Sequence, residues 1–250
     1  MDCFSFLTGN RMLRNDDDSP ALELIIAPTF GIERDCWFVI TGCRYQSVTL
    51  VSPHSPTTAE EVEHAKIYHA MAGSELRFAG KHSVGFRTYL CFRESDGADG
   101  EFSITKRDEY GEIFHWFDPE GYIRVLKGPE YRYVKEKDAF TGQSWTITRD
   151  FSDMGFRLSG RNRTLSVEMS DMVSEAVADG TIQLTPKGPI VLLRHRQTVG
   201  GYPRVYNVIS ADIDILGQYA PNQLIRFRKV TLQEAKELNR QKLNVLNIFH

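Results

Sequence analysis

Residues 179–203 read D-G-T-I-Q-L-T-P-K-G-P-I-V-L-L-R-H-R-Q-T-V-G-G-Y-P, and this stretch decides the fold class that the sequence predicts. Residues 181–185 alternate between polar and apolar side chains, and residues 189–193 form a continuous apolar run of strand length. Pro186 and Gly188 between them are typical of a tight turn. Two strands joined by such a turn, with many similar short strands elsewhere, predict a mainly β chain with few helices.

The segment after the second strand, Q-T-V-G-G-Y-P at residues 197–203, is the candidate functional site. Gly200 and Gly201 would let a ligand approach the main chain, because no Cβ stands in the way. Pro203 restricts the backbone of Tyr202 and so gives the tyrosine hydroxyl a defined position. The alternative is that this segment only connects two strands.

Size and composition indicate an ordinary globular chain. With 250 residues it can bury a substantial core, in one large domain or two smaller ones. Its 41% hydrophobic and 25% charged residues are typical of soluble proteins. A faint internal repeat, in which residues 72–78 resemble residues 220–227, favours two related halves, which we place at residues 1–120 and 121–250.

The charge and hydropathy patterns argue against several functional classes. Thirty basic and 33 acidic residues give a net charge of -3, without a nucleic-acid footprint or a polybasic membrane patch. No apolar run approaches the ~20 residues that span a bilayer, and the first residues do not resemble a secretory signal. The cysteines form no C-x-x-C pair, so we expect free thiols and a cytoplasmic protein without nucleic-acid or membrane partners.

No cofactor site is expected in this chain alone. It lacks the P-loop pattern G-x-x-x-x-G-K-[ST] and a biotin attachment signal. If ATP or biotin takes part, we expect partner subunits to supply it. His54, His64 and His69 do not form the tight grouping of a zinc site, so no metal site is predicted.

Periodicity places the remaining elements. Helices are expected at residues 2–14, 57–68 and 165–178 and from Leu232 onward, where Thr231 and Glu234 have the spacing of a capping box. Further short strands are expected at residues 21–26, 36–41, 76–78, 86–92, 113–117, 122–126, 131–133, 145–148 and 156–158.

Several segments together resemble the allophanate hydrolase subunit 2 family. That family includes the C subunit of prokaryotic 5-oxoprolinase, the Kip-type proteins and part of the carboxyltransferase region of urea carboxylase. The similar segments lie at both ends and in the middle of the chain, at residues 9–13, 128–131, 154–158, 181–183, 189–193, 197–203 and 208–212.

The resemblance implies a fold and a reaction. The fold would be two cyclophilin-like β-barrel halves, and the family has loop and strand where residues 57–68 are expected to be helical. The substrate would be a small amide or urea-like molecule, either carboxylated from carboxybiotin or, as 5-oxoproline, hydrolysed at the expense of ATP. The partner would be a B-type subunit, similar to allophanate hydrolase subunit 1.

Such reactions require groups that stabilise negative charge on oxygen. The candidate donors in the turn are Gln197, Thr198, Gly200, Gly201 and Tyr202. Arg157 either pairs with a substrate carboxylate or faces solvent from an alternating strand. Gln183 and Glu175 match family positions near the turn, although Glu175 could equally lie on an exposed helix face.

The sequence also departs from the family. Members usually carry a T-V-Q-D-x-G-R segment ahead of the position of Met1, and a glycine-rich run where this chain has C-F-R-E-S-D-G at residues 91–97. His195 stands where the family often has an aspartate, so an imidazole would act as the catalytic base near the turn.

Three hypotheses follow. The chain is a subunit of an ATP-dependent amide hydrolase or carboxyltransferase, a catalytically silent regulatory protein of the Kip type, or an enzyme with an altered substrate that uses His195 as its base. The intact turn favours the first hypothesis, and the missing motifs favour the second.

Overall fold

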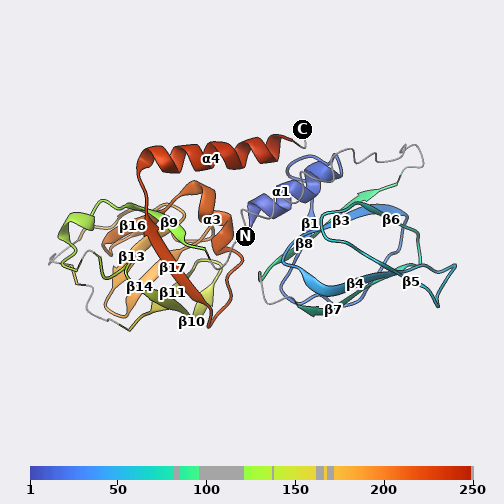
Figure 1. Cartoon of the computed structure of the whole chain (residues 1–250), viewed down its shortest axis with the longest axis horizontal. Coiled ribbons are helices and arrows are strands. Elements are labelled where there is room, and N and C mark those ends of the chain that lie inside the picture. The colour runs from blue at the N-terminus through green and yellow to red at the C-terminus, as the bar shows by residue number, and fades with distance from the viewer. Residues whose placement is uncertain (82–84, 96–120, 137, 162–165, 168–171, 249–250) are drawn as a thin grey trace. The chain divides into compact units, whose positions relative to one another are not determined.

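The computed structural model describes residues 1–81, 85–95, 121–136, 138–161, 166–167 and 172–248, and Figure 1 labels most of their helices and strands. The chain divides into two compact units. The N-terminal unit comprises residues 2–117 and 244–250, and the C-terminal unit comprises residue 1 and residues 118–243. The strand predicted at residues 113–117 lies outside the described residues. No helix in the described part is long and apolar enough to cross a membrane.

The N-terminal unit contains two four-stranded antiparallel sheets. The first has the order β1 (Ala21–Leu24), β8 (Thr88–Glu94), β3 (Cys36–Gly42) and β6 (Tyr68–Ala70). The second has the order β2 (Phe30–Gly31), β7 (Glu75–Lys81), β4 (Tyr45–Val51) and β5 (Ala59–Glu61). Helix α1 (Cys3–Met12) precedes them, and the Asp2 carboxylate caps it by accepting a hydrogen bond from the Ser5 N–H.

Alternation along β3 explains how this unit is filled. Phe38 and Ile40 face a core that they share with residues of β4, β6 and β7. Val39 faces the other way and packs with Met12 of α1 and Cys91 of β8. Because successive side chains of a strand point to opposite faces, one strand contributes to both layers.

The C-terminal unit is a closed barrel of seven strands. The order around the barrel is β10 (Ser144–Ser152), β11 (Gly155–Ser159), β14 (Gly188–Leu192), β13 (Thr181–Thr185), β16 (Arg204–Val208), β9 (Ile123–Lys127) and β17 (Leu224–Lys229). Neighbours are antiparallel except β17 and β9, which pair in parallel where the barrel closes. The barrel is filled by buried side chains from each strand, among them Ile147, Phe156, Val191, Ile182, Tyr206, Val125 and Phe227.

Smaller elements, and helix α4 (Leu232–Asn247) as far as Leu243, complete this unit. A two-stranded ribbon pairs β12 (Glu175–Ala176) with β15 (Val199–Gly200). Short helices occur as η1 (Tyr131–Tyr133), η2 (Ser210–Asp212) and α3 (Ile213–Leu216). Helix α4 follows β17, and the Glu234 N–H donates to the Thr231 hydroxyl as the capping box predicts.

The mainly β prediction is confirmed, and so are the helices at α1 and α4. The helix predicted at residues 57–68 is wrong, because β5 forms there and pairs with β4. The helix predicted at residues 165–178 is wrong where it is described, because residues 172–174 are irregular and β12 follows them. Residues 131–133 form a 3₁₀ helix instead of a strand. The likeness of each half to cyclophilin stays a prediction.

Candidate functional site

A row of four residues crosses the outside of the C-terminal barrel. Arg157 lies opposite Ile190, Ile190 lies opposite Gln183, and Gln183 lies opposite Arg204. Directly opposed residues of neighbouring strands share a face, and the adjacent Val191 points into the barrel core. The four side chains therefore start from the outer surface of β11, β14, β13 and β16.

The Gln183 side chain packs beneath the glycine-rich turn and forms a hydrogen bond with it. This side chain is 1% exposed, and its Nε2 donates a hydrogen bond of 3.2 Å to the Tyr202 carbonyl oxygen. A Cβ at position 200 would lie 2.6 Å from this Nε2, so any residue other than glycine would force the Gln183 amide to move. The prediction that Gln183, Gly200 and Tyr202 belong to one place thus has a geometric basis.

The β12–β15 ribbon holds the turn at the surface. Gly200 pairs with Glu175, and the Val177 N–H donates to the Thr198 carbonyl oxygen at 3.0 Å. The Gly201 main chain and the Tyr202 ring remain accessible to solvent. The ribbon therefore presents glycine main chain and a tyrosine side by side.

Arg204 fastens this ribbon to the barrel. Its Nε and Nη2 donate to the two Glu130 carboxylate oxygens at 2.9 and 2.8 Å, and its Nη1 donates to the Ala176 carbonyl oxygen at 2.9 Å. Nη2 also pairs with Glu175. The hydrogen bonds from Arg204 lower the pKa of Glu130, and the same bond raises the pKa of Arg204, so both groups are charged near neutral pH.

Two predicted residues lie away from this cluster. The His195 side chain is 68% exposed, and its Nδ1 lies 3.9 Å from an Asp153 carboxylate oxygen. The His195 N–H donates to the Asp153 carbonyl oxygen, so this residue lies against the β10–β11 turn. Arg157 is directed to Asp150 and to the β13–β14 hairpin. Gln197 and Thr198 are exposed at the start of the turn.

The sequence patterns predict no role for Arg204 or Glu130. Arg204 directly follows Pro203, and Glu130 lies in the G-P-E-Y segment that already resembled the family. The one signal in the sequence that could have pointed to Arg204 is its position, because it is a charged residue at the start of a strand beside the candidate site. Glu175, by contrast, was identified, but it lies in β12 and not on a helix.

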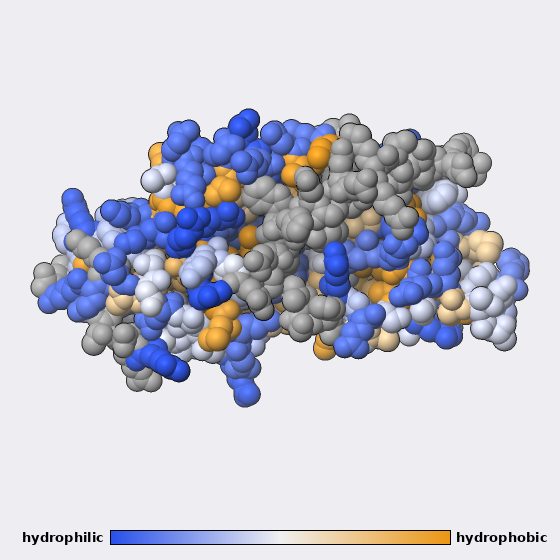
Figure 2. Space-filling view, in the orientation of Figure 1, coloured by the Kyte–Doolittle hydropathy of each residue, from blue (hydrophilic) through white to orange (hydrophobic). Residues whose placement is uncertain are grey.

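Metal ligation finds no support in the described residues, where no three His, Cys, Asp or Glu side chains lie close enough to share an ion. The surface seen in Figure 2 is largely hydrophilic, with hydrophobic residues in separate small patches. The polar groups around the turn are the glycine main chain, the Gln183 amide, the Tyr202 hydroxyl and the Glu130–Arg204 ion pair.

Residues 1–99 and 103–229 match the family described as carboxyltransferase domain, subdomain A and B. The chain belongs to this family. It is 29% identical over 272 residues to the C subunit of 5-oxoprolinase from Haemophilus influenzae, covering 96% of this chain and 85% of the relative. It is also 29% identical over 254 residues to the C subunit of 5-oxoprolinase from Escherichia coli, covering 90% and 80% of the two chains.

Solved structures agree on the fold of this carboxyltransferase-domain chain. Urea amidolyase of Kluyveromyces lactis superposes with a TM-score of 0.80 at 19% identity, over 100% of this chain and 18% of that protein. Urea carboxylase of K. lactis gives the same TM-score at 18% identity, over 100% of this chain and 26% of that one. The chain therefore spans about a fifth to a quarter of these larger proteins, and the likeness establishes the fold alone.

Proposed function

We propose that this chain works as a subunit of the 5-oxoprolinase C type, together with a B-type partner subunit, in the ATP-dependent hydrolysis of 5-oxoproline. The observation that carries the proposal is the turn at Gly200 and Gly201, supported by Gln183 in a chain that aligns over 96% of its length with the C subunit of a 5-oxoprolinase. The alternative reaction for this subunit is a related biotin-dependent carboxyl transfer to an amide or urea. ATP or biotin comes through the partner.

The chemistry of the turn supports an amide substrate. Attack on a resonance-stabilised amide develops negative charge on its oxygen, and preorganised N–H and O–H donors stabilise that charge. The accessible Gly201 main chain and the Tyr202 hydroxyl can supply such donors, with the Thr198 hydroxyl and Gln197 amide at the start of the same turn. The ribbon is fixed through Arg204, so these donors do not need to reorganise during the reaction.

A catalytically silent regulator of the Kip type is the second candidate. The observation that favours it is the position of His195, which is exposed beside Asp153 and makes no hydrogen bond to Gln183 or Tyr202 among the described residues. A general base has to reach the reacting group, and the contacts of His195 do not place its imidazole at the turn. Its role as base in an altered reaction is the weakest of the three hypotheses.

The test is a comparison of Gly201→Val with Gly31→Val. A Cβ at Gly201 first meets the Ser174 hydroxyl at 3.3 Å, and one at Gly31 meets nothing within 4 Å, so both variants are expected to fold. The proposal predicts that the complex recovered with a B-type partner hydrolyses ATP when 5-oxoproline is added, and that only Gly201→Val abolishes this activity. Recovery of a B-type partner without ATP hydrolysis would favour the regulator hypothesis. Equal activity of the two variants would show that the turn takes no part in the reaction.

A further inference from the structure

A pocket of about 400 Å³ opens in the C-terminal unit beside the β13–β14 hairpin. Its apolar lining is Trp145, Leu158, Leu184, Pro186 and Pro189. Its polar side chains are Thr148, Arg157, Ser159, Thr185 and Lys187. This lining has two cations and three hydroxyls but no carboxylate among the described residues, and its volume is typical of small-molecule sites.

A bulge in β10 lies opposite Arg157. Ile147 pairs with Leu158, and Phe151 pairs with Phe156, so three residues of β10 face the single residue Arg157. Bulges often redirect side chains next to functional sites. Here the bulge contributes Thr148 to the pocket lining and residue 150 to the arginine.

Arg157 is held in a fixed position by the hairpin. Its Nη1 donates to the Thr185 hydroxyl at 2.8 Å and to the Gly188 carbonyl oxygen at 3.5 Å. Its Nε donates to Asp150 at 2.9 Å. The Arg157 side chain is 20% exposed, but the Asp150 side chain is 71% exposed. A pair with so exposed a partner contributes little to stability, so another carboxylate can replace Asp150 at the guanidinium.

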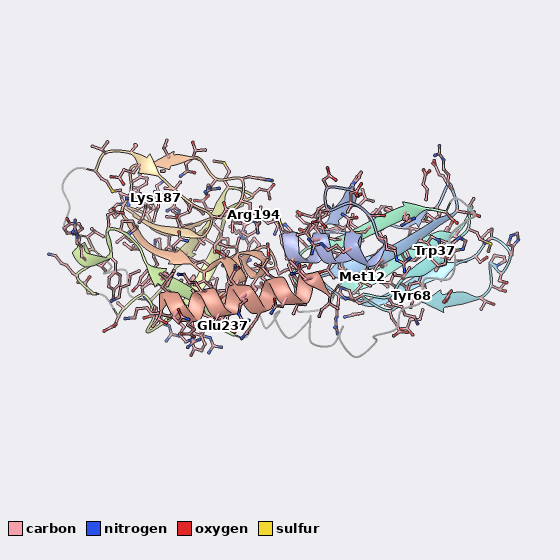
Figure 3. The ribbon with its side chains drawn as sticks, turned by 90° about the horizontal axis from the view of Figure 1, so that it is seen from above. Met12, Trp37, Tyr68, Lys187, Arg194 and Glu237 are labelled. Carbon is pink, nitrogen blue, oxygen red and sulfur yellow. The ribbon has the colours of Figure 1, made fainter. Side chains whose placement is uncertain are left out.

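Lys187 supplies the second cation from the β13–β14 hairpin, where Figure 3 labels it. It is exposed, and among the described residues no carboxylate forms an ion pair with its ammonium. An Arg and a Lys beside apolar walls suit a ligand with one anionic end and one apolar end.

We propose that this pocket binds a small carboxylate with an apolar body. The carboxylate displaces Asp150 at the Arg157 guanidinium, the Lys187 ammonium adds a second attraction, and the apolar body lies against Leu184 and Pro186. Arg157 and Gln183 lie two strands apart on the barrel, a separation of about 10 Å between backbones. No residue of the glycine-rich turn lines the pocket, although the N–H of the lining residue Leu184 donates to the Pro203 carbonyl oxygen at 2.9 Å. The existence of the pocket does not depend on the proposed function.

The experiment is calorimetric titration of the full chain with two carboxylates, 5-oxoproline and phenylacetate, and with their uncharged counterparts 2-pyrrolidinone and phenylacetamide. We expect the wild type to bind at least one carboxylate and neither counterpart. Arg157→Gln should weaken that binding about tenfold or more, because a charge-assisted hydrogen bond is lost. Asp150→Asn should tighten it by up to about fivefold, because the internal competitor is removed.

Two further variants keep the result interpretable. Lys187→Gln should weaken binding about two- to threefold even if Arg157→Gln unfolds the barrel. Arg149→Gln makes the same change of charge in the same bulge, at a residue outside the pocket lining, and should leave binding unchanged. Absence of carboxylate binding, equal binding of the uncharged counterparts, or unchanged binding by Arg157→Gln and Lys187→Gln would overturn the proposal.

Discussion

Replacing Arg204 with methionine tests whether this residue fastens the ribbon that carries the turn. The Arg204 and Glu130 side chains are 12% and 11% exposed, so the change leaves a nearly buried carboxylate without its counter-ion. Breaking a fully buried pair costs ~3–5 kcal/mol, and for this slightly accessible pair we expect a loss of about 2–3 kcal/mol in the free energy of unfolding. Methionine keeps the length of the stem, so lost packing contributes little.

The assay is urea unfolding of the full chain, followed by circular dichroism and tryptophan fluorescence. In the double variant Glu130→Gln/Arg204→Met no buried charge is left alone, and we expect about 1–2 kcal/mol of the loss to be recovered. Arg240→Met is the matched control, because its ion pair with Glu237 is exposed and should contribute no more than about 0.5 kcal/mol. A loss below about 1 kcal/mol for Arg204→Met, without coupling to Glu130, would refute the reasoning.

Three further predictions concern backbone contact and pH. Gly128→Ala should cost about 2–3 kcal/mol in urea unfolding, because the new Cβ would lie 2.1 Å from the Arg204 carbonyl oxygen; Gly31→Ala has open space and should be nearly neutral. The pKa of Glu130 is lowered in the folded chain, chiefly by its hydrogen bond with Arg204, so its stabilising effect is present above the ordinary value of 4.5 and is lost as the pH falls below it. The stability difference between wild type and Glu130→Gln should therefore shrink in acid, and a constant difference would contradict this. Burial, aided by a nearby arginine, lowers the pKa of His64 from 6.5 to about 3. Only the unfolded chain then binds this proton between those values, so unfolding of the N-terminal unit should become easier by up to about 1.4 kcal/mol per pH unit on acidification, and His64→Gln should remove this slope.

Local patterns predicted the β class and the start of α4, but tertiary pairing overrode two helix predictions. At residues 59–61 the acidic residues resembled the first turn of a helix, yet β4 offers an edge on which they form β5. Around residues 172–176 apolar side chains recur at helical spacing, but Val173 is 82% exposed and Ala176 pairs with Val199. Propensity is a weak determinant where a neighbouring strand can satisfy the backbone.

The candidate site was predictable in its residue types but not in its geometry. The sequence pointed to Gly200 and Gln183 separately, and only the register between β13 and β16 places the amide beneath the turn. Asp150 could not be connected with Arg157, because their contact depends on a bulge that has no clear sequence signal. Pairings between distant strands are set by the whole barrel and not by any short segment.

The way the barrel closes has a consequence for biosynthesis. Strand β9 is the first barrel strand to leave the ribosome and β17 is the last, about a hundred residues later, yet β17 pairs with both β9 and β10. Until β17 emerges, the nascent chain carries two unpaired strand edges, which are open to wrong partners and to chaperones. A chain that ends just before Leu224 would therefore form an open sheet with two unpaired edges, prone to aggregation, and not a smaller barrel.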